Sequence, residues 1–244
     1  MSLLTIIQEV TSELGIRIPD TVVGNTDAQV VQLLALANRA GREVARRGGR
    51  GWSSLVRSQT FTLTTGTEDQ GAIQGTIVTD SDFKYYVPDT MWDRTTSMPV
   101  TGPLDSQAYQ TLQAFPVTGP YFQYMFREDG HLYINPAPGS ADTIAFEYVS
   151  SAWCEQSDGT ARTSNKFEAD TDKARLQEDL LILNIIYRWR RVKGLDYSEE
   201  FMDYERAVLD SLAKDGGKPK INLESADRNY RQAGIIIPIG SWTV

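Results

Sequence analysis

The chain has 244 residues, a hydrophobic content of 41% and a formal net charge of −8. That length and apolar content allow one large domain or two modest ones, and the negative charge argues against a general nucleic-acid-binding surface. No run approaches the ~18 apolar residues of a membrane span, and residues 1–10 lack the basic region of a signal peptide. Cys154 is the single cysteine, which excludes an intrachain disulfide framework and suits assembly in a cytoplasm.

Two helices are predicted at the N-terminus. The first covers residues 3–14, where apolar side chains recur at helical spacing, and Gly15 ends it. The second is expected to start near Thr26, which has capping-box spacing to Gln29, and to stop at Gly48-Gly49. Its apolar face consists of Val30, Leu33, Leu34, Ala37, Gly41 and Val44.

The hydrophobic period changes to that of strands after residue 58. Strands are expected at 58–64, 72–79, 83–88, 122–128, 130–136 and 142–150, with the last three forming a meander. A short helix is expected to begin with Ser106 as its N-cap and to end at Phe115-Pro116. These patterns indicate a small antiparallel sheet or sandwich.

Residues 155–174 are polar and are predicted to form a loop. Helical spacing returns with Leu176, Leu180 and Leu183 and ends at Gly194. Ser198 is predicted to cap a further helix, which the sequence DGGKP at 215–219 terminates.

The fold class expected from these elements is α+β. A helical bundle of two N-terminal and two C-terminal helices would carry an inserted antiparallel β domain and an extended C-terminal arm. The predicted ranges are 1–57 for the N-terminal helical part, 58–154 for the β domain, 155–215 for the C-terminal helical part packing on the N-terminal helices, and 216–244 for the arm.

The last segment, 216–244, shows no sustained period yet is apolar near its end. It contains Ile235, Ile236, Ile237, Ile239 and Trp242, and a disordered tail normally lacks such residues. It can dock on a neighbouring subunit or partner, or it can fold back on its own core.

Groups that could perform catalysis are scarce. His131 is the only histidine and lies in a predicted strand, which argues against histidine triads and multi-histidine metal sites. Cys154 has no basic neighbour in sequence that would lower the pKa of its thiol. No GxxxxGK[ST] phosphate-binding loop is present, and paired acids fall in turns or at helix starts. We expect no enzymatic activity, no cofactor and no metal site.

Arginine clusters and tryptophans are the candidate interaction residues. Cations near helix C-termini complement the macrodipole on a solvated face, or they pair with carboxylates of a partner; DNA binding is a third possibility. Trp92 and Trp242 lie beside turn or arm residues, where a tryptophan needs cover. The candidate interface residues are Arg39, Arg42, Arg46, Arg47, Arg50, Trp92, Arg188, Arg190, Arg191, Ile235, Ile236, Ile237 and Trp242.

Four segments resemble the head-to-tail adaptor proteins of tailed bacteriophages, the connector or tail-tubular-A-like family. They are GWSSLVRSQTFTLTTG (51–66), DFKYYVPDTMWDR (82–94), TGPL (101–104) and EDLLILNIIYRWRRVKGLDY (178–197). Together with the order of parts, a helical pair, a β-rich insertion, a second helical pair and an arm, the resemblance covers residues 1–215.

The resemblance implies a structural protein of the virion head–tail junction, assembled in the host cytoplasm. Such adaptors form a homo-oligomeric ring, usually of twelve subunits, beneath the portal vertex. The helical part packs around the ring, the C-terminal segment engages the portal protein, and the β part faces the tail or nozzle protein. DNA passes through the central channel without specific binding, and no membrane is involved.

Two other interpretations stay open at this point. An aromatic-rich β domain can stack sugars, so the chain could be a carbohydrate- or surface-binding module of a phage tail, using Trp92, Tyr85 or Tyr86. A hydrolase would require two carboxylates that converge in one pocket.

Overall fold

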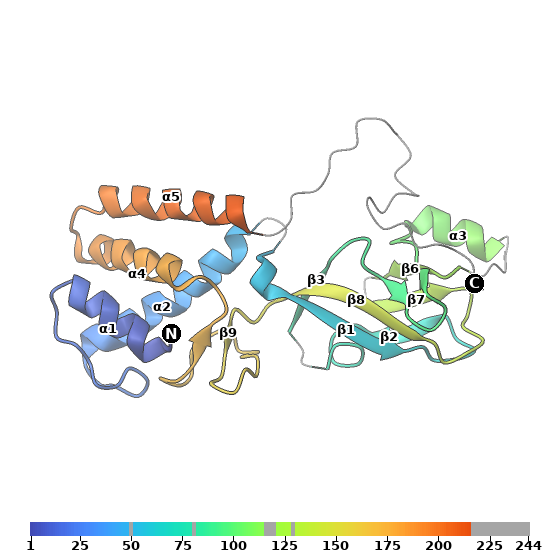
Figure 1. Ribbon diagram of the computed structural model, residues 1–244, viewed down its shortest axis with the longest axis horizontal. Coiled ribbons are helices and arrows are strands. Elements are labelled where there is room, and N and C mark those ends of the chain that lie inside the picture. The colour runs from blue at the N-terminus through green and yellow to red at the C-terminus, as the bar shows by residue number, and fades with distance from the viewer. Residues whose placement is uncertain (49–50, 80–81, 115–120, 128–129, 216–244) are drawn as a thin grey trace, which may run out of the picture.

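The computed structural model describes residues 1–48, 51–79, 82–114, 121–127 and 130–215. It is a mixed α+β protein with antiparallel sheets, as the sequence predicts. Four helices gather at one end of an elongated molecule and the sheets at the other (Figure 1). We call these ends the helical lobe and the β lobe.

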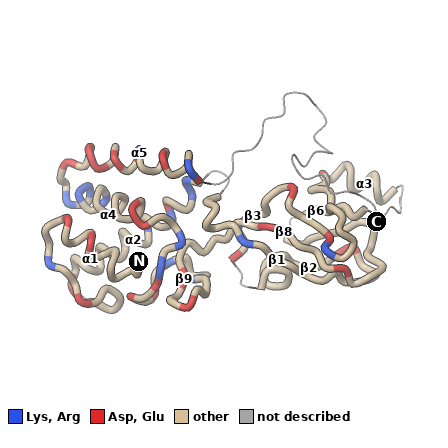
Figure 2. The backbone as a smooth tube through the Cα atoms, in the orientation of Figure 1, with Lys and Arg blue, Asp and Glu red and all other residues tan. Residues whose placement is uncertain are grey.

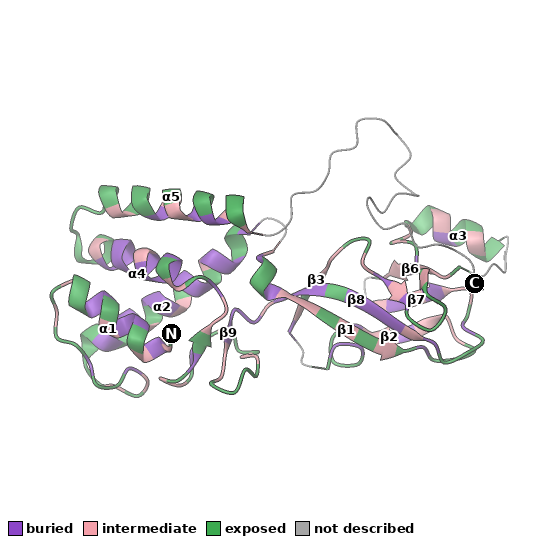
Figure 3. Ribbon diagram, in the orientation of Figure 1, coloured by how far each residue is buried: buried purple, intermediate pink, exposed green. Residues whose placement is uncertain are grey.

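The helical lobe is built around one central helix. Its helices are α1 (Leu3–Glu13), α2 (Ala28–Arg47), α4 (Glu178–Lys193) and α5 (Ser198–Lys214). Helix α4 contacts each of the other three and is buried on most sides (Figure 3). A helix that is apolar nearly all round is stable only when its neighbours cover it, so α4 holds the lobe together.

The start of α2 differs from the prediction. Asp27, not Thr26, is the N-cap, and its carboxylate accepts a hydrogen bond from the Gln29 backbone N–H at 2.8 Å. The predicted capping box is therefore wrong. A carboxylate is a stronger acceptor than a hydroxyl and is favoured by the positive end of the helix.

Two further caps are displaced by one or two residues. Helix α3 (Ser106–Ala114) follows Asp105, whose carboxylate accepts from the Ala108 N–H at 2.7 Å, so Ser106 is the first helical residue and not the N-cap. Ser198 likewise begins α5, and its backbone N–H and hydroxyl both donate to Asp196. At α3 an aspartate thus makes the capping contact that was predicted for a serine, whereas Tyr197 occupies the N-cap position of α5 and makes no side-chain capping bond.

The β lobe contains two antiparallel sheets. Its strands are β1 (Val56–Thr62), β2 (Asp69–Ala72), β3 (Phe83–Tyr86), β4 (Trp92–Asp93), β5 (Met98–Pro99), β6 (Gln123–Phe126), β7 (His131–Asn135) and β8 (Thr143–Ser150). The order is β1-β8-β4-β5, with β3 also paired to β8, in one sheet and β2-β7-β6 in the other. Strand β8 is bonded along both edges, because β1 pairs with its whole length while β3 and β4 share the opposite edge.

Two strand predictions need correction. The segments 122–128, 130–136 and 142–150 do not form a meander, since β6 and β7 pair with each other and β8 lies in the other sheet. Residues 73–79 form turns and isolated bridges, not a strand. Gly75 has a φ of 89°, a left-handed conformation that breaks an extended run.

The joint between the lobes is a continuous piece of structure. Beyond β8 the chain enters the helical core with Trp153, whose ring packs edge-to-face on Phe167 at 4.8 Å. The short strand β9 (Cys154–Glu155) follows and pairs antiparallel with β10 (Lys173–Ala174). At the same joint, Ser53 of the 3₁₀ turn η1 (Ser53–Leu55) donates from its backbone N–H to the Asp215 carboxylate at 2.9 Å.

The polar segment 155–174, predicted as a loop, is held in place by two carboxylates and includes part of β9 and all of β10. Asp172 accepts from the Arg162 guanidinium and from the backbone N–H groups of residues 168 and 169. Asp170 accepts from the backbone N–H groups of Val22 and Val23. The segment therefore ties the loop after α1 to the joint.

Candidate interaction surface

The described residues contain little that could act in catalysis. No group of three or more His, Cys, Asp or Glu side chains is arranged to hold a metal ion within these ranges. The His131 Nδ1 atom lies 2.9 Å from a carboxylate oxygen of Asp69 on the surface of the sheet. Burial raises the pKa of the Cys154 thiol to about 12, which keeps it protonated and unreactive at neutral pH.

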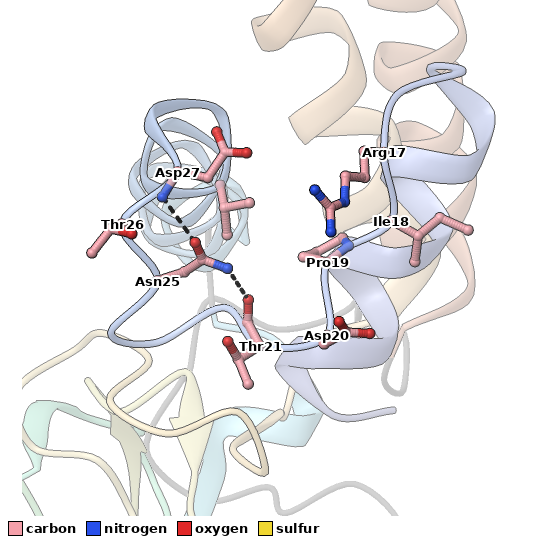
Figure 4. A pocket seen from close by; sticks show the side chains of 9 residues that line it. Arg17, Ile18, Pro19, Asp20, Thr21, Asn25, Thr26 and Asp27 are labelled. Atoms are coloured by element: carbon pink, nitrogen blue, oxygen red, sulfur yellow. Dashed lines mark hydrogen bonds between the residues drawn. The ribbon is translucent and has the colours of Figure 1, made fainter.

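A polar hollow of about 340 Å³ opens beside the segment that connects α1 to α2 (Figure 4). Asn25 spans this segment, because its Nδ2 donates to the Thr21 carbonyl and its Oδ1 accepts from the Asp27 N–H, each at 2.8 Å. The hollow is lined by Arg17, Ile18, Pro19, Asp20, Thr21, Asn25, Thr26, Asp27 and Val30. Asp27 is already engaged as the cap of α2, so the lining shows no pair of free, convergent carboxylates.

Three of the predicted interface arginines form ion pairs within the helical lobe. Arg188 is only 8% exposed and contacts the Glu43 carboxylate. Glu43 also lies 3.5 Å from Arg47, which forms a two-point contact with Glu205. These pairs link α2, α4 and α5, so the charges of Arg47 and Arg188 have a structural role inside the chain.

The third, Arg190, is half-buried and lies 2.8 Å from Glu200 at the turn between α4 and α5. The other arginines of the two clusters face outward. Arg39, Arg42, Arg46 and Arg191 are exposed and form no ion pair with any residue in the described ranges. A contact between these arginines and another molecule stays a prediction; Arg50 and the arm residues Ile235, Ile236, Ile237 and Trp242 lie outside the described residues.

Six large apolar residues stand exposed between Val192 and Leu209, around the turn that joins α4 to α5 and along α5 itself. Large apolar residues rarely stand exposed together on the surface of a monomer unless they contact a partner. In this patch, side-chain exposure reaches 55% at Val192, 63% at Met202 and 66% at Leu209. Its members are Val192, Leu195, Tyr197, Phe201, Met202 and Leu209. Figure 3 shows the outward side of α5 largely exposed, and we call these six residues the corner patch.

The corner patch was not among the residues predicted to lie at an interface, although the sequence contains a signal for it. Helical spacing assigns Phe201, Tyr204 and Val208 to the inward stripe of α5, and Tyr204 and Val208 are indeed buried. Met202 and Leu209 fall off that stripe, so apolar residues on the outer face could have been noticed from the sequence.

The aromatic residues of the β lobe are mostly engaged within it. Tyr86 packs against Tyr124 and Phe126 with ring centroids 5.5 and 5.4 Å apart, and Tyr85 packs against the helical core. Trp92 is half-buried in β4, where it pairs with Pro99 and Ala145. The residues named for sugar stacking therefore do not form an open aromatic platform.

The sequence matches no protein-family model, and no curated protein is similar to it. Within the described ranges, no helix combines the length and the apolar content needed to cross a membrane.

Proposed function

We propose that this chain is a structural virion protein, a head-to-tail adaptor that forms a ring between the portal and the tail. The observation that carries the proposal is the corner patch, with Met202 and Leu209 about two-thirds exposed. Six large apolar side chains over residues 192–209 lose contact with water only if another molecule covers them. The resemblance of residues 1–215 to phage adaptors supplies the identity of that assembly.

The proposed arrangement gives each part of the chain a role. The helical lobe makes the contacts between subunits, in a ring that the resemblance sets at twelve. The segment 216–244, with its isoleucines and Trp242, docks on the portal protein, and the β lobe meets the tail or nozzle protein. DNA passes through the channel without specific binding, and the protein performs no chemical reaction.

Electron microscopy of the full chain mixed with portal particles of its own virus tests the proposal. We expect rings on the portals, and quantitative mass spectrometry of purified virions should find about as many copies of this chain as of the portal protein. A chain that stays monomeric, forms no ring on portals and is absent from virions would refute the proposal.

A matched pair of variants tests the corner patch itself. Met202→Glu with Leu209→Glu places two charges on the outer face of α5, where no described side chain packs over them, so the fold should persist. Ring formation should fall strongly. Tyr121→Glu is the control, because Tyr121 is 52% exposed in the β lobe and lies outside the corner patch. If the double variant and the control variant lose ring formation equally, the corner patch is not a specific contact.

A further inference from the structure

The helical lobe carries a basic face whose charges are not neutralised within the chain. Arg39, Arg42 and Arg46 project from the same exposed side of α2, since three- and four-residue steps return to one face of a helix. Arg191 stands in the last turn of α4. Arg188 of α4 contacts Glu43 of α2, and Arg39 and Arg191 each lie about one helical turn from that ion pair along their own helices. We call Arg39, Arg42, Arg46 and Arg191 the basic face.

The same lobe carries acidic residues on different elements, along α1 and on the segment between α1 and α2 (Figure 2). Glu9 and Glu13 are one turn apart on the exposed side of α1. Asp20 and Asp27 follow on the segment before α2 and border the hollow of Figure 4, where Arg17 is the one cation among the lining residues. These four carboxylates, the acidic face, form no ion pair with any residue that the structure describes.

The contrast with the rest of the lobe is informative. Arg47, Arg162, Arg175, Arg188 and Arg190 each contact a carboxylate. The like charges within a cluster repel one another, and an approaching group of opposite charge lowers their electrostatic energy. The basic face and the acidic face are opposite in sign, and no ion pair joins them inside the chain.

We propose that the basic face of one copy docks on the acidic face of the next copy. This inference rests on the proposed function and names the subunit contact of the ring. The two faces are different surfaces, so the contact is heterologous: each copy uses one face on one neighbour and the other face on the second, which is the geometry that builds rings. Arg191 adjoins Val192, so the basic face continues into the corner patch, and the contact combines an apolar part with a charged part.

A second copy fits this face better than a nucleic acid does. The chain has a net charge of −8, which repels DNA at long range, while the acidic face offers the planar carboxylates that guanidinium groups bind at two points. The exposed pairs are screened by salt, with a Debye length of about 10 Å at 0.1 M. Assembly should therefore weaken about tenfold or more between 0.05 and 0.5 M salt.

Complementary charge reversal is the decisive experiment. One variant carries Arg39→Glu, Arg42→Glu and Arg46→Glu, which reverses three of the four charges of the basic face, so that both of its faces are acidic. The other carries Glu9→Lys, Glu13→Lys and Asp20→Lys, which reverses three of the four charges of the acidic face, so that both of its faces are basic. Each alone should lose ring formation on portal particles by about 100-fold in concentration, because like charges then meet at every contact. Mixed in equal amounts they should recover assembly, because alternation of the two variants restores opposite charges at every interface.

The controls separate this inference from the proposed function. Arg94→Glu and Glu147→Lys reverse exposed charges of the β lobe and should leave assembly unchanged. If the wild-type chain forms rings on portals while the charge variants also do so alone, or if their mixture fails to recover, the inference is wrong and the proposed function stands. If the wild-type chain forms no ring at all, both are wrong. Loss of binding to a 30-bp DNA duplex in the Arg39/Arg42/Arg46 variant, with assembly intact, would assign the basic face to DNA and overturn the proposal.

Discussion

Replacing Gly41 by alanine tests how the two lobes are joined. Gly41 lies in α2 directly against the ring of Trp153, and a Cβ atom there would lie 2.5 Å from the ring atom Cε3 and closer still to Cζ3 and Cη2. Carbon atoms in contact are normally about 3.5–4.0 Å apart, so the overlap is about 1 Å at three atoms. Trp153 is 1% exposed and its Nε1 donates to the Asn165 carbonyl at 3.2 Å, which leaves the ring little room to move.

Two opposing effects set the size of the change. Glycine to alanine in an ordinary helix interior stabilises by about 1 kcal/mol. Overpacking a buried site costs about 1–3 kcal/mol, and an overlap with three ring atoms places this site at the upper end. Gly41→Ala should therefore lower the free energy of unfolding by about 2 kcal/mol, as measured by urea denaturation.

The control is a background without the Trp153 ring, in which the effect of Gly41→Ala on stability should change sign. In a Trp153→Leu background the ring is gone, and Gly41→Ala should then stabilise by about 1 kcal/mol through helix propensity alone. If Gly41→Ala stabilises the wild-type chain, the close packing of α2 on Trp153 is refuted.

The remaining predictions concern buried charges. Glu43→Gln leaves the guanidinium of Arg188 buried without a counter-charge, so it should lower the free energy of unfolding in urea by about 3 kcal/mol. Glu205→Gln removes a more exposed ion pair and should lower it by less than about 1 kcal/mol. Similar losses of stability in the two variants would contradict the assignment of the Arg188 pair as buried. Burial raises the pKa of Asp172, but the hydrogen bonds from Arg162 and two backbone N–H groups outweigh it and hold the pKa below its ordinary value of 3.8. The ionised Asp172 carboxylate therefore stabilises the fold above that value, and this stabilisation is lost as the pH falls through the pKa of the native state. The loss of unfolding free energy in Asp172→Asn should be large at pH 6 and smaller at pH 3. A loss that does not change with pH would refute this assignment.

The helices could be predicted from the sequence, but their first residues could not. Apolar spacing identified α1 and α2 because their buried faces repeat over many residues. A cap depends on one side chain, and neighbours such as Thr26 and Asp27 compete for the same backbone N–H groups. Local pattern does not decide between them.

The partners of strands and of charged side chains could not be predicted for one shared reason, because the partners are far apart along the chain. Nothing near β8 in the sequence says that β1 is its partner. Arg188 lies in a cluster of arginines near a helix end, which suggests an exposed face, yet its partner Glu43 belongs to another helix far away in sequence. The outward members of the cluster form no ion pair within the described ranges, and their assignment to an interface stays a prediction.

Strand β8 gives the molecule a mechanical property. Its eight residues span about 27 Å at ~3.4 Å per residue, and the chain continues from them into the helical core at Trp153. A strand bonded along both edges resists a pull along its axis by shearing all of its ladders together. In a protein placed between two larger assemblies, such a strand would transmit a tilt or a pull from one lobe to the other with little deformation in between.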